Sequence, residues 1–197
     1  MQSVEIQNLI QQLAKLPGLG RRSGRRIALH LLKKPEALLQ PLVQSLQDAA
    51  AAIVTCEVCN SIDTTSPCAI CVDPKRRTGQ LCIVADVSDL WALERGNIFA
   101  GHYHVIGGIL SAIDGVGPED LAIDSLMQRL QAGEYAEVIF ALCATVDGQT
   151  TMHFLSDMLK EFELKTSVLA HGLPIGGELD YLDDGTLTTA FAQRRAV

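Results

Sequence analysis

The sequence predicts an α/β multidomain protein, in which a helical N-terminus and a four-cysteine zinc finger precede a mostly parallel sheet flanked by helices. Three observations carry this prediction. Apolar residues recur at helical spacing through roughly the first 54 residues, two Cys-x-x-Cys pairs follow between residues 56 and 71, and strands alternate with helices from residue 81 onward. With 197 residues, 48% of them hydrophobic, the chain is long enough to bury a substantial core.

The N-terminal region, residues 1–54, begins with two helices joined by a glycine turn. Apolar residues in segment 4–16 recur close to the helical period, and Pro17 ends this helix. The glycines that follow permit backbone conformations closed to other residues, so we expect a tight hairpin there. A second helix is then predicted to begin near Arg21 or Ser23.

Packing within this region can also be predicted. The second helix has an apolar stripe that can pack on the first helix, formed by Gly24, Ile27, Ala28 and Leu31. A third helix is predicted over residues 35–54. Its expected inner face consists of Leu38, Leu39, Leu42, Val43 and Leu46.

Basic residues gather around the hairpin. The chain has a net charge of −7, yet residues 15–34 contain seven Lys and Arg residues and no Asp or Glu, which leaves a net charge of −14 for the rest. Backbone N–H groups at a glycine turn before a helix form an anion site, and the arginines can neutralise neighbouring phosphates. The pattern resembles a helix-hairpin-helix DNA-binding motif; the alternative is a plain helix turn with a solvated basic face. The candidate DNA-binding residues are Pro17, Gly18, Gly20, Arg21, Arg22, Arg25 and Arg26.

Four cysteines, Cys56, Cys59, Cys68 and Cys71, stand at metal-ligand spacing within sixteen residues. Two Cys-x-x-Cys knuckles can complete the four-coordinate shell of one Zn²⁺ per chain, and a shell filled by protein leaves no open position, so the ion should be structural. A disulfide pair and a redox dithiol are the alternatives. Disulfides would need an oxidising compartment, but the N-terminus lacks the features of a signal peptide. A redox dithiol usually has a single Cys-x-x-Cys pair, whereas this segment has two. Zinc in a cytoplasmic protein is therefore favoured.

The segment after the cysteines starts with a basic turn at residues 74–79 and continues as alternating strands and helices. Cys82 and Cys143 fall in apolar strand-like runs, where we expect buried thiols. His102 and His104 would share one strand face, which suits a metal, a phosphate or an ordinary strand face. The predicted order is strand 81–85, helix 88–95 capped by Ser88 or Asp86, strand 102–106, a turn-rich segment 109–118, helix 118–130, strand 138–144, helix 149–162 and strand 166–170.

Five features give the chain a more specific resemblance. They are the hairpin LPGLGRRSGRR, the four cysteines, GHYHVIGGILSAIDGVGPEDL, ATVDGQTT and GLPIGGELDYLDDGTLTTA. Together they make the chain similar over its full length to the RecR family of bacterial recombination mediators. The resemblance implies four parts: a helix-hairpin-helix DNA-binding region over 1–54, a four-cysteine zinc finger over 55–72, a Toprim domain over 80–173 and a Walker B-like oligomerisation segment over 174–197.

The resemblance also implies partners. RecR-like chains form homodimers or homotetrameric rings, bind single- and double-stranded DNA without sequence specificity, and join RecO and RecF. Their complexes help to load RecA on single-stranded DNA coated with single-strand-binding protein. This implies a nucleoid-associated cytoplasmic protein with no membrane partner, in line with the lack of any apolar run approaching eighteen residues.

The resemblance further implies that the chain is not an enzyme. Toprim enzymes hold Mg²⁺ with a Glu after the first strand and an Asp-x-Asp pair after a later one. Here those places offer Ala85, and Asp147 followed by Gln149. One carboxylate is too few to bind Mg²⁺ and stabilise an in-line displacement, so no catalytic residue is assigned; a Mg²⁺-dependent nuclease or primase-like enzyme is the alternative. Asp147 is kept as a candidate contact for RecO.

The C-terminal segment LAHGLPIGGELDYLDD has the strand-plus-acid form of a Walker B element. The chain contains no Gly-x-x-x-x-Gly-Lys-Ser/Thr cradle for a triphosphate, so this segment should be structural. Its acidic residues suit either a solvated turn or a second metal site. They are Glu178, Asp180, Asp183 and Asp184.

Overall fold

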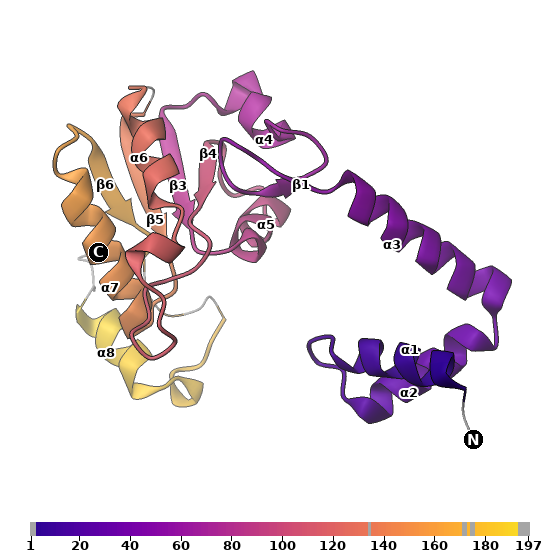
Figure 1. Cartoon of the computed structure of the whole chain (residues 1–197). Helices are drawn as coiled ribbons and strands as arrows, with labels where there is room; N and C mark the ends of the chain where they lie inside the picture. The colour runs from indigo at the N-terminus through magenta and orange to yellow at the C-terminus, as the bar shows by residue number, and fades with distance from the viewer. Residues whose placement is uncertain (1–2, 134, 171–172, 174–175, 193–197) are drawn as a thin grey trace. The chain divides into compact units, whose positions relative to one another are not determined.

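The computed structural model describes residues 3–133, 135–170, 173 and 176–192 (Figure 1). The chain divides into two compact units, residues 1–53 and 54–197. Within the described ranges, no helix is long and apolar enough to cross a membrane.

The first unit is built on two antiparallel helices, α1 (Val4–Ala14) and α2 (Arg21–Leu32). The predicted stripe on α2 is confirmed, because Gly24, Ala28 and Leu31 are buried. A Cβ atom on Gly24 would lie 3.0 Å from the backbone oxygen of Ile10 in α1, so the missing side chain is what lets the two helices approach so closely.

The predicted single helix over 35–54 is wrong in its first turn, and its predicted inner face is half-buried only at Leu38 and Leu39. The structure has a π-helical turn, Pro35–Leu39, followed by α3 (Gln40–Ala52). Pro41 has no N–H to bond a carbonyl four residues earlier, so a regular ladder cannot run through this junction. The apolar residues of α3 are largely open to solvent in the single chain. Their exposed fractions are 40% for Leu42, 38% for Val43 and 61% for Leu46.

The second unit contains a four-stranded parallel sheet in the order β4-β3-β5-β6. Strand β3 lies inside the sheet, and its residues after Gln80 are apolar and buried because helices cover both of its faces. The chain adds β4 on one side of β3 and then returns to add β5 on the other, which places the topological switch point between β3 and β5. The strands are β3 (Gln80–Val84), β4 (His102–Val105), β5 (Glu137–Ala141) and β6 (Lys165–Val168).

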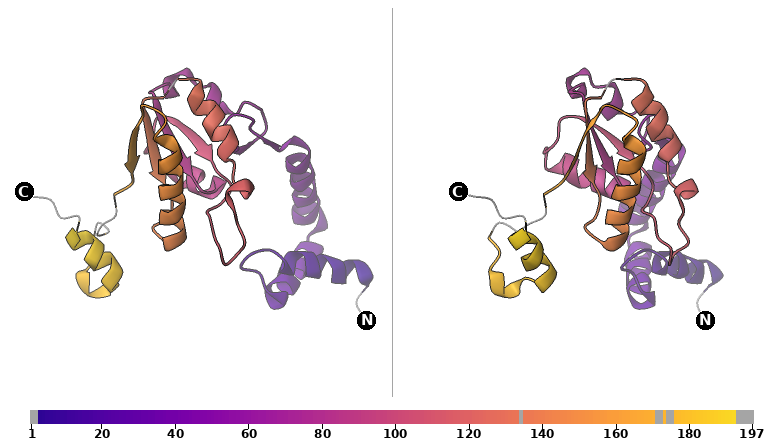
Figure 2. Two further views of the ribbon diagram at one scale, coloured as in Figure 1. Left: turned by 60° about the vertical axis from the view of Figure 1, so that its left-hand side comes forward. Right: turned by 90° about the vertical axis from the view of Figure 1, so that its left-hand side faces the viewer.

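Helices cover the two faces of this sheet unequally. Figure 2 shows α5 on one face and the pair α6 and α7 on the other. Leu90 of α5 packs against Cys82, Val84 and Tyr103, while Leu126 of α6 and the buried leucines of α7 pack against the opposite face of β3 and β5. The helix bounds are α5 (Val87–Arg95), α6 (Ile123–Gln131) and α7 (Val146–Leu159).

The four-cysteine segment, residues 55–72, is a small lobe of the second unit, called the cysteine lobe below. Two short antiparallel strands, β1 (Val54–Thr55) and β2 (Ile62–Asp63), bracket the first cysteine pair. Helix α4 (Ala69–Val72) carries the last cysteine, and a 3-10 turn, Pro74–Arg76, leads on to β3. Asp86, one of the two predicted caps, does cap α5: its carboxylate accepts the Ser88 N–H at 2.8 Å.

The helix predicted over 118–130 is broken in the middle. A 3-10 turn, Pro118–Asp120, is separated from α6 by Leu121 and Ala122. Leu121 is buried in the core, and the Ala122 N–H bonds the carbonyl of Ile106 at 2.9 Å, so both residues are held out of a continuous helix by tertiary contacts.

The prediction of a buried Cys143 is also wrong. Strand β5 ends at Ala141 rather than Ala144, and the Cys143 side chain is exposed. Cys82 in the centre of the sheet is buried as predicted, and burial raises the pKa of its thiol to about 12. Thr145 then caps α7 by accepting the Gly148 N–H, so the helix begins three residues earlier than predicted.

Replacing Gly148 by alanine should destabilise the protein by about 2 kcal/mol, although alanine is favoured over glycine by about 1 kcal/mol in most helices. A Cβ atom at this position would overlap the backbone oxygen of Cys143. Urea unfolding of the full chain measures the change. Thr150→Ala, an exposed position in the same helix, is the control and should change stability by less than about 0.5 kcal/mol. A more stable Gly148→Ala would contradict the predicted overlap.

At the C-terminus the described residues form a 3-10 turn, Leu179–Tyr181, and helix α8 (Asp184–Ala192). Residues 171–172 and 174–175 of the predicted Walker B-like strand lie outside the described residues, and the described remainder contains no strand beyond β6. Asp183 accepts the Thr186 N–H at 2.9 Å and so caps α8.

Candidate nucleic-acid and metal sites

The hairpin between α1 and α2 is a tight turn of the kind its glycines predict. The Leu19 N–H bonds the carbonyl of Leu16 at 3.0 Å across Pro17 and Gly18. Gly18 has a φ of +76°, which suits the third position of a type II turn and which side chains other than glycine rarely adopt. The turn therefore ends directly before α2, whose first N–H groups have no partner within the helix.

The first turn of α2 combines two features of a phosphate site. Gly20 occupies the cap position and has no side chain to satisfy the free N–H groups there. Arg21, Arg22, Arg25 and Arg26 are all exposed on this helix, beside that free end. The arrangement offers backbone donors, a helix dipole and guanidinium groups to an anion in one place.

The second unit brings the four cysteines together. Their Sγ atoms all lie within 4.8 Å of one another, with Cys59 and Cys68 at 3.5 Å and Cys56 and Cys71 at 4.0 Å. Four sulfurs at about 2.3 Å from one Zn²⁺ would form a tetrahedron with edges of about 3.8 Å. These sulfur separations are close to that edge and far from the roughly 2.05 Å of a disulfide, so the thiols are free and the group can hold a metal ion.

Backbone N–H groups stabilise the thiolate form of one cysteine in this cluster, Cys56. Burial alone would raise the pKa of the Cys56 thiol, but N–H groups of Cys68, Cys59 and Val58 outweigh burial and bring it to about 7. The Cys68 N–H lies 3.3 Å from the Cys56 sulfur. Burial raises the pKa of Cys68 to about 11, so the cluster would bind a metal with release of protons.

Residues 60–67 form a polar insert between the two Cys-x-x-Cys pairs, and its side chains hold the pairs in place. Ser66 Oγ accepts the Glu57 N–H at 3.0 Å, which joins the insert to the first pair. The Asp63 carboxylate accepts the N–H groups of Thr64 at 2.7 Å and Ala69 at 3.0 Å, which joins β2 to the start of α4. The polar insert thus makes the fold-back that its composition predicts.

Hydrogen bonds attach the cysteine lobe to strand β4 of the sheet. The Val105 N–H donates to the carbonyl of Cys59 at 2.9 Å. Arg129 of α6 donates to the carbonyls of Val58 at 3.2 Å and Tyr103 at 2.7 Å, so one guanidinium joins the lobe, the strand and the helix. Asn60 donates to Val105 O at 3.3 Å and Ser125 Oγ at 3.2 Å.

His104 lies within this attachment, and the interpretation of the histidine pair as part of an ordinary strand face is confirmed, because both rings are buried in β4. The His104 ring is fully buried, with Nε2 3.0 Å from the Ala122 carbonyl and 3.4 Å from Asn60 Nδ2. The nearby carbonyl indicates that Nε2 carries a proton. Burial is the main cause that lowers the pKa of His104 to about 4, and the positive charge of Arg129 lowers it further.

The depressed pKa of His104 predicts acid sensitivity. Because the unfolded chain takes up a proton near pH 6.5 and the folded chain only near pH 4, stability present above pH 6.5 is lost as the pH falls towards 4. This group alone should remove about 2 kcal/mol of the unfolding free energy between pH 7 and pH 5. Urea unfolding at both pH values, compared with His104→Asn, measures it. Equal pH losses in both proteins would contradict the assignment.

The positions that correspond to the Mg²⁺ ligands of Toprim enzymes lie at the switch point of the sheet. Ala85 follows β3 directly and has no polar side chain, while Asp147 is half-buried in the first turn of α7. Asp86 lies beside Ala85, but its carboxylate caps α5, and its own N–H bonds Asp89. Of these three positions, Ala85 has no carboxylate and the Asp86 carboxylate is used as a helix cap. Asp147 is therefore the one carboxylate among them that does not cap α5.

The acidic C-terminal residues do not gather round a common point. Within the part of the chain that the structure describes, the four cysteines are the only His, Cys, Asp or Glu residues brought into metal-ligand range. Asp183 instead caps α8, and its pKa is lowered mainly by hydrogen bonds from Thr186. The solvated-turn interpretation of this segment agrees with that geometry.

Two residues at the lobe attachment were missed from the sequence. Asn60 has a φ of 59°, a conformation in which Asn is enriched, and its place directly after Cys59 was a usable signal. Arg129 lies 71 residues from Val58. In the sequence it is one basic residue on an amphipathic helix, and nothing there distinguishes it from an arginine that is exposed to solvent.

Comparisons with known proteins agree with this architecture. Family models match three segments: "RecR, helix-hairpin-helix" over residues 6–50, "Toprim domain" over 79–170 and "RecR, C-terminal" over 172–195. Three relatives are each named "Recombination protein RecR". The chain is 59% identical to that of Bradyrhizobium sp. strain ORS 278, with 96% of each chain covered, and 57% identical to that of Rhodospirillum rubrum, with 100% of each covered. It is 58% identical to that of Hyphomonas neptunium, covering 98% of this chain and 96% of the relative. A four-cysteine lobe, a helix-hairpin-helix and a Toprim sheet in one chain, with relatives this similar over their full length, show that the chain belongs to the RecR family.

Proposed function

We propose that this protein is a non-enzymatic mediator of recombinational DNA repair that binds DNA through the α1–α2 hairpin. The proposal depends on the N-terminus of α2. It follows the glycine turn at Gly18 and Gly20, has no side-chain cap and is flanked by four exposed arginines. Each contact is to a phosphate and none reads a base, so binding is independent of sequence and includes both single and double strands. The hairpin set is Pro17, Gly18, Gly20, Arg21, Arg22, Arg25 and Arg26.

The protein acts as a homodimer or a homotetrameric ring. One hairpin binds phosphates weakly, and several hairpins in a ring act as one multivalent surface. The apolar face of α3 supports assembly, because Leu42, Val43 and Leu46 are more than a third exposed in the single chain. The C-terminal segment 174–197 contributes a second contact between subunits.

The four cysteines hold one structural Zn²⁺ per chain. The sulfur separations fit a tetrahedral site, and four protein ligands leave no position for water or substrate. The ion orders residues 55–72, a segment too short to have an apolar core of its own, between the DNA-binding region 1–54 and the Toprim domain 80–173.

RecO and RecF are the protein partners, and the complex helps RecA to replace single-strand-binding protein on DNA in the cytoplasm, at the nucleoid. Asp147, in the first turn of α7 at the switch point of the sheet, is the proposed contact for RecO. Because Ala85 follows β3 where an acidic residue could stand, this edge of the sheet has one carboxylate fewer for a basic partner.

The double substitution Arg21→Ala and Arg25→Ala should weaken DNA binding by about tenfold at physiological salt, equally for unrelated sequences. The slope of log affinity against log salt should become shallower by about 1.4 for single strands, since two phosphate contacts are lost. Fluorescence anisotropy of labelled oligonucleotides over a salt series measures both. The control is Lys160→Ala, because Lys160 pairs with Asp157 on the other unit. Unchanged affinity of the double variant at low salt would overturn the hairpin proposal.

The rival function is a Mg²⁺-dependent nuclease on the Toprim scaffold. A denaturing gel of the same DNA samples, incubated with Mg²⁺, tests it. The mediator proposal expects intact DNA, and shortened DNA that depends on Asp147 would favour the nuclease.

A further inference from the structure

The basic turn before β3 has no part in the function proposed above. Residues 74–79 include three consecutive basic residues, of which Lys75 and Arg77 are exposed and Arg76 is half-buried. Asp73 starts the turn by accepting the Lys75 N–H at 2.9 Å. The turn is therefore an ordered element that presents Lys75 to solvent.

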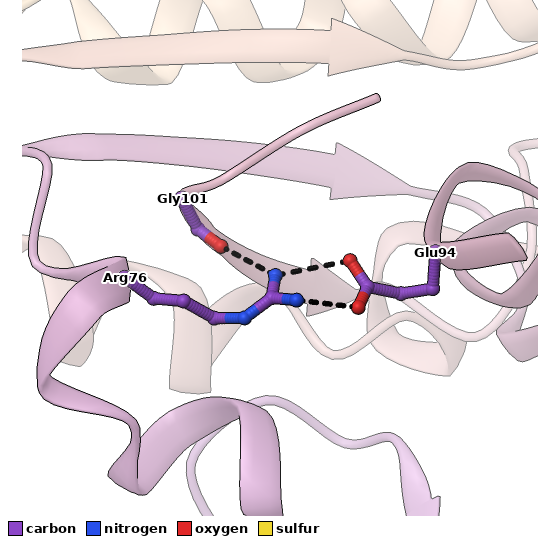
Figure 3. A network of polar contacts seen from close by, with 3 residues as sticks. All are labelled: Arg76, Glu94 and Gly101. Carbon is purple, nitrogen blue, oxygen red and sulfur yellow. Dashed lines mark hydrogen bonds and ion pairs between the residues drawn. The ribbon is translucent and has the colours of Figure 1, made fainter. Parts of the chain in front are cut away.

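Arg76 fixes this turn against helix α5. Its guanidinium donates to both carboxylate oxygens of Glu94, at 3.0 Å and 2.5 Å, and to the carbonyl of Gly101 at 3.2 Å (Figure 3). Only 16% of the Arg76 side chain and 25% of the Glu94 side chain are exposed. Such a two-pronged pair, partly shielded from water, sets the position of the turn relative to the helix far better than a surface ion pair does.

The outer face of α5 next to this pair carries a tryptophan. Trp91 is 59% exposed, whereas its neighbour Leu90 is buried in the sheet core. Trp91 precedes Glu94 by three residues and Arg95 by four, so both are its neighbours on the helix surface. An indole open to solvent therefore lies beside the Arg76–Glu94 pair, with a second cation next to it.

The exposed cations on α5 and on the turn that Arg76 holds against it favour an anionic ligand. Lys75 and Arg95 are exposed and take part in none of the ion pairs among the described residues, whereas Glu94 is neutralised by Arg76. An exposed aromatic ring with one cation on its own helix and another on the turn fixed to that helix suits single-stranded nucleic acid, which needs charges for its phosphates and a flat surface for an unpaired base.

We propose that Lys75, Trp91 and Arg95 form a contact site for single-stranded DNA, in which the two cations bind phosphates and a base stacks on the Trp91 indole. This inference rests on the proposed function, since it takes DNA binding as given, and it adds a second site on the other unit of the chain. Duplex DNA hides its base faces and does not use the stacking surface. The site thus gives the protein a preference for single strands that the hairpin, which contacts phosphates alone, does not supply.

The single tryptophan of the chain makes the stacking step directly measurable. Titration of the full-length protein with an unlabelled oligothymidylate should quench the Trp91 fluorescence. An abasic oligonucleotide of the same length and a duplex should bind with much less quenching, because neither presents a free base. Equal quenching by all three would overturn stacking.

Substitutions test the site with labelled single-stranded DNA in an anisotropy assay, which does not depend on the tryptophan signal. Trp91→Ala should weaken binding by about tenfold, and Trp91→Phe should retain most of the affinity because it keeps a ring. Lys75→Ala and Arg95→Ala should each lower the salt slope by about 0.7. Lys160→Ala, which removes an exposed lysine at the end of α7, is the matched control and should leave the slope unchanged. Circular dichroism confirms that each variant is folded.

The outcomes separate this inference from the function on which it rests. If wild-type protein binds labelled DNA but Trp91→Ala binds equally well, without quenching in the wild type, the inference is overturned and the hairpin remains the DNA site. If Trp91→Ala weakens only the association with another protein, the surface is a protein contact and the inference is again overturned. If wild-type protein binds no DNA even at low salt, the proposed function and this inference fail together.

Discussion

Replacement of Cys59 by serine is expected to release the metal from the chain and to lower the free energy of unfolding of the second unit by at least about 5 kcal/mol. The Cys59 side chain is fully buried, and its sulfur lies 3.5 Å from that of Cys68. A hydroxyl there is a poor ligand for zinc, so the three remaining cysteines would hold the ion weakly and the segment would lose the ion that orders it. Metal analysis of the purified protein and urea unfolding followed by Trp91 fluorescence measure the two effects.

Cys143→Ser is the control for this experiment, because the Cys143 thiol is exposed and outside the cluster. This variant should keep one zinc per chain and wild-type stability. Removal of the ion from the wild-type protein with a chelator should reproduce the Cys59→Ser result. A chelated protein that unfolds at the same urea concentration as before would contradict a structural role for the metal.

Replacement of Arg129 by alanine is expected to lower the free energy of unfolding by about 4 kcal/mol, since it breaks the attachment of the cysteine lobe to the sheet. Arg129 donates to two carbonyls and, through Nε, to the Tyr135 hydroxyl at 2.8 Å. The substitution leaves these acceptors without their cationic donor in a partly buried place. Urea unfolding measures the loss.

A comparison with Arg129→Lys separates the geometry of this contact from its charge. Lysine keeps the positive charge but cannot reach three acceptors in the plane of a guanidinium, so about half of the stability should be lost. Zinc content should remain at one per chain in both variants, because the ligands are untouched. Equal stability of the lysine variant and the wild type would show that charge alone matters.

Features that depend on residues close together in the chain could be predicted from the sequence. The Cys-x-x-Cys pairs, the polar insert between them and the glycine turn after Pro17 are each encoded within about sixteen residues or fewer. The parallel sheet could be predicted as well, because residues 81–85 form an apolar run and helices separate the strands.

Features set by contacts between distant residues could not be predicted. Arg129 meets Val58 across 71 residues, and nothing in the sequence around either marks that contact. The apolar residues on the exposed side of α3 recur at the same spacing as those of a buried helix face. The sequence therefore predicts an inner face that includes Leu42 and Leu46, although both are exposed. The apolar run of β5 continues through Cys143, although the strand ends at Ala141. The exact boundaries of an element are the part that a sequence pattern predicts least well.

The contact between Cys59 and Val105 also bears on solubility. Strand β4 is an edge of the sheet, and an uncovered edge offers its backbone groups to strands of other molecules. Here the Val105 N–H and carbonyl are occupied by Cys59 and Asn60 of the cysteine lobe. The metal-binding lobe therefore also acts as a cover against edge-to-edge pairing. We therefore expect a chain that loses its metal while the sheet stays folded to gain a route to self-association, so that metal loss promotes aggregation as well as unfolding.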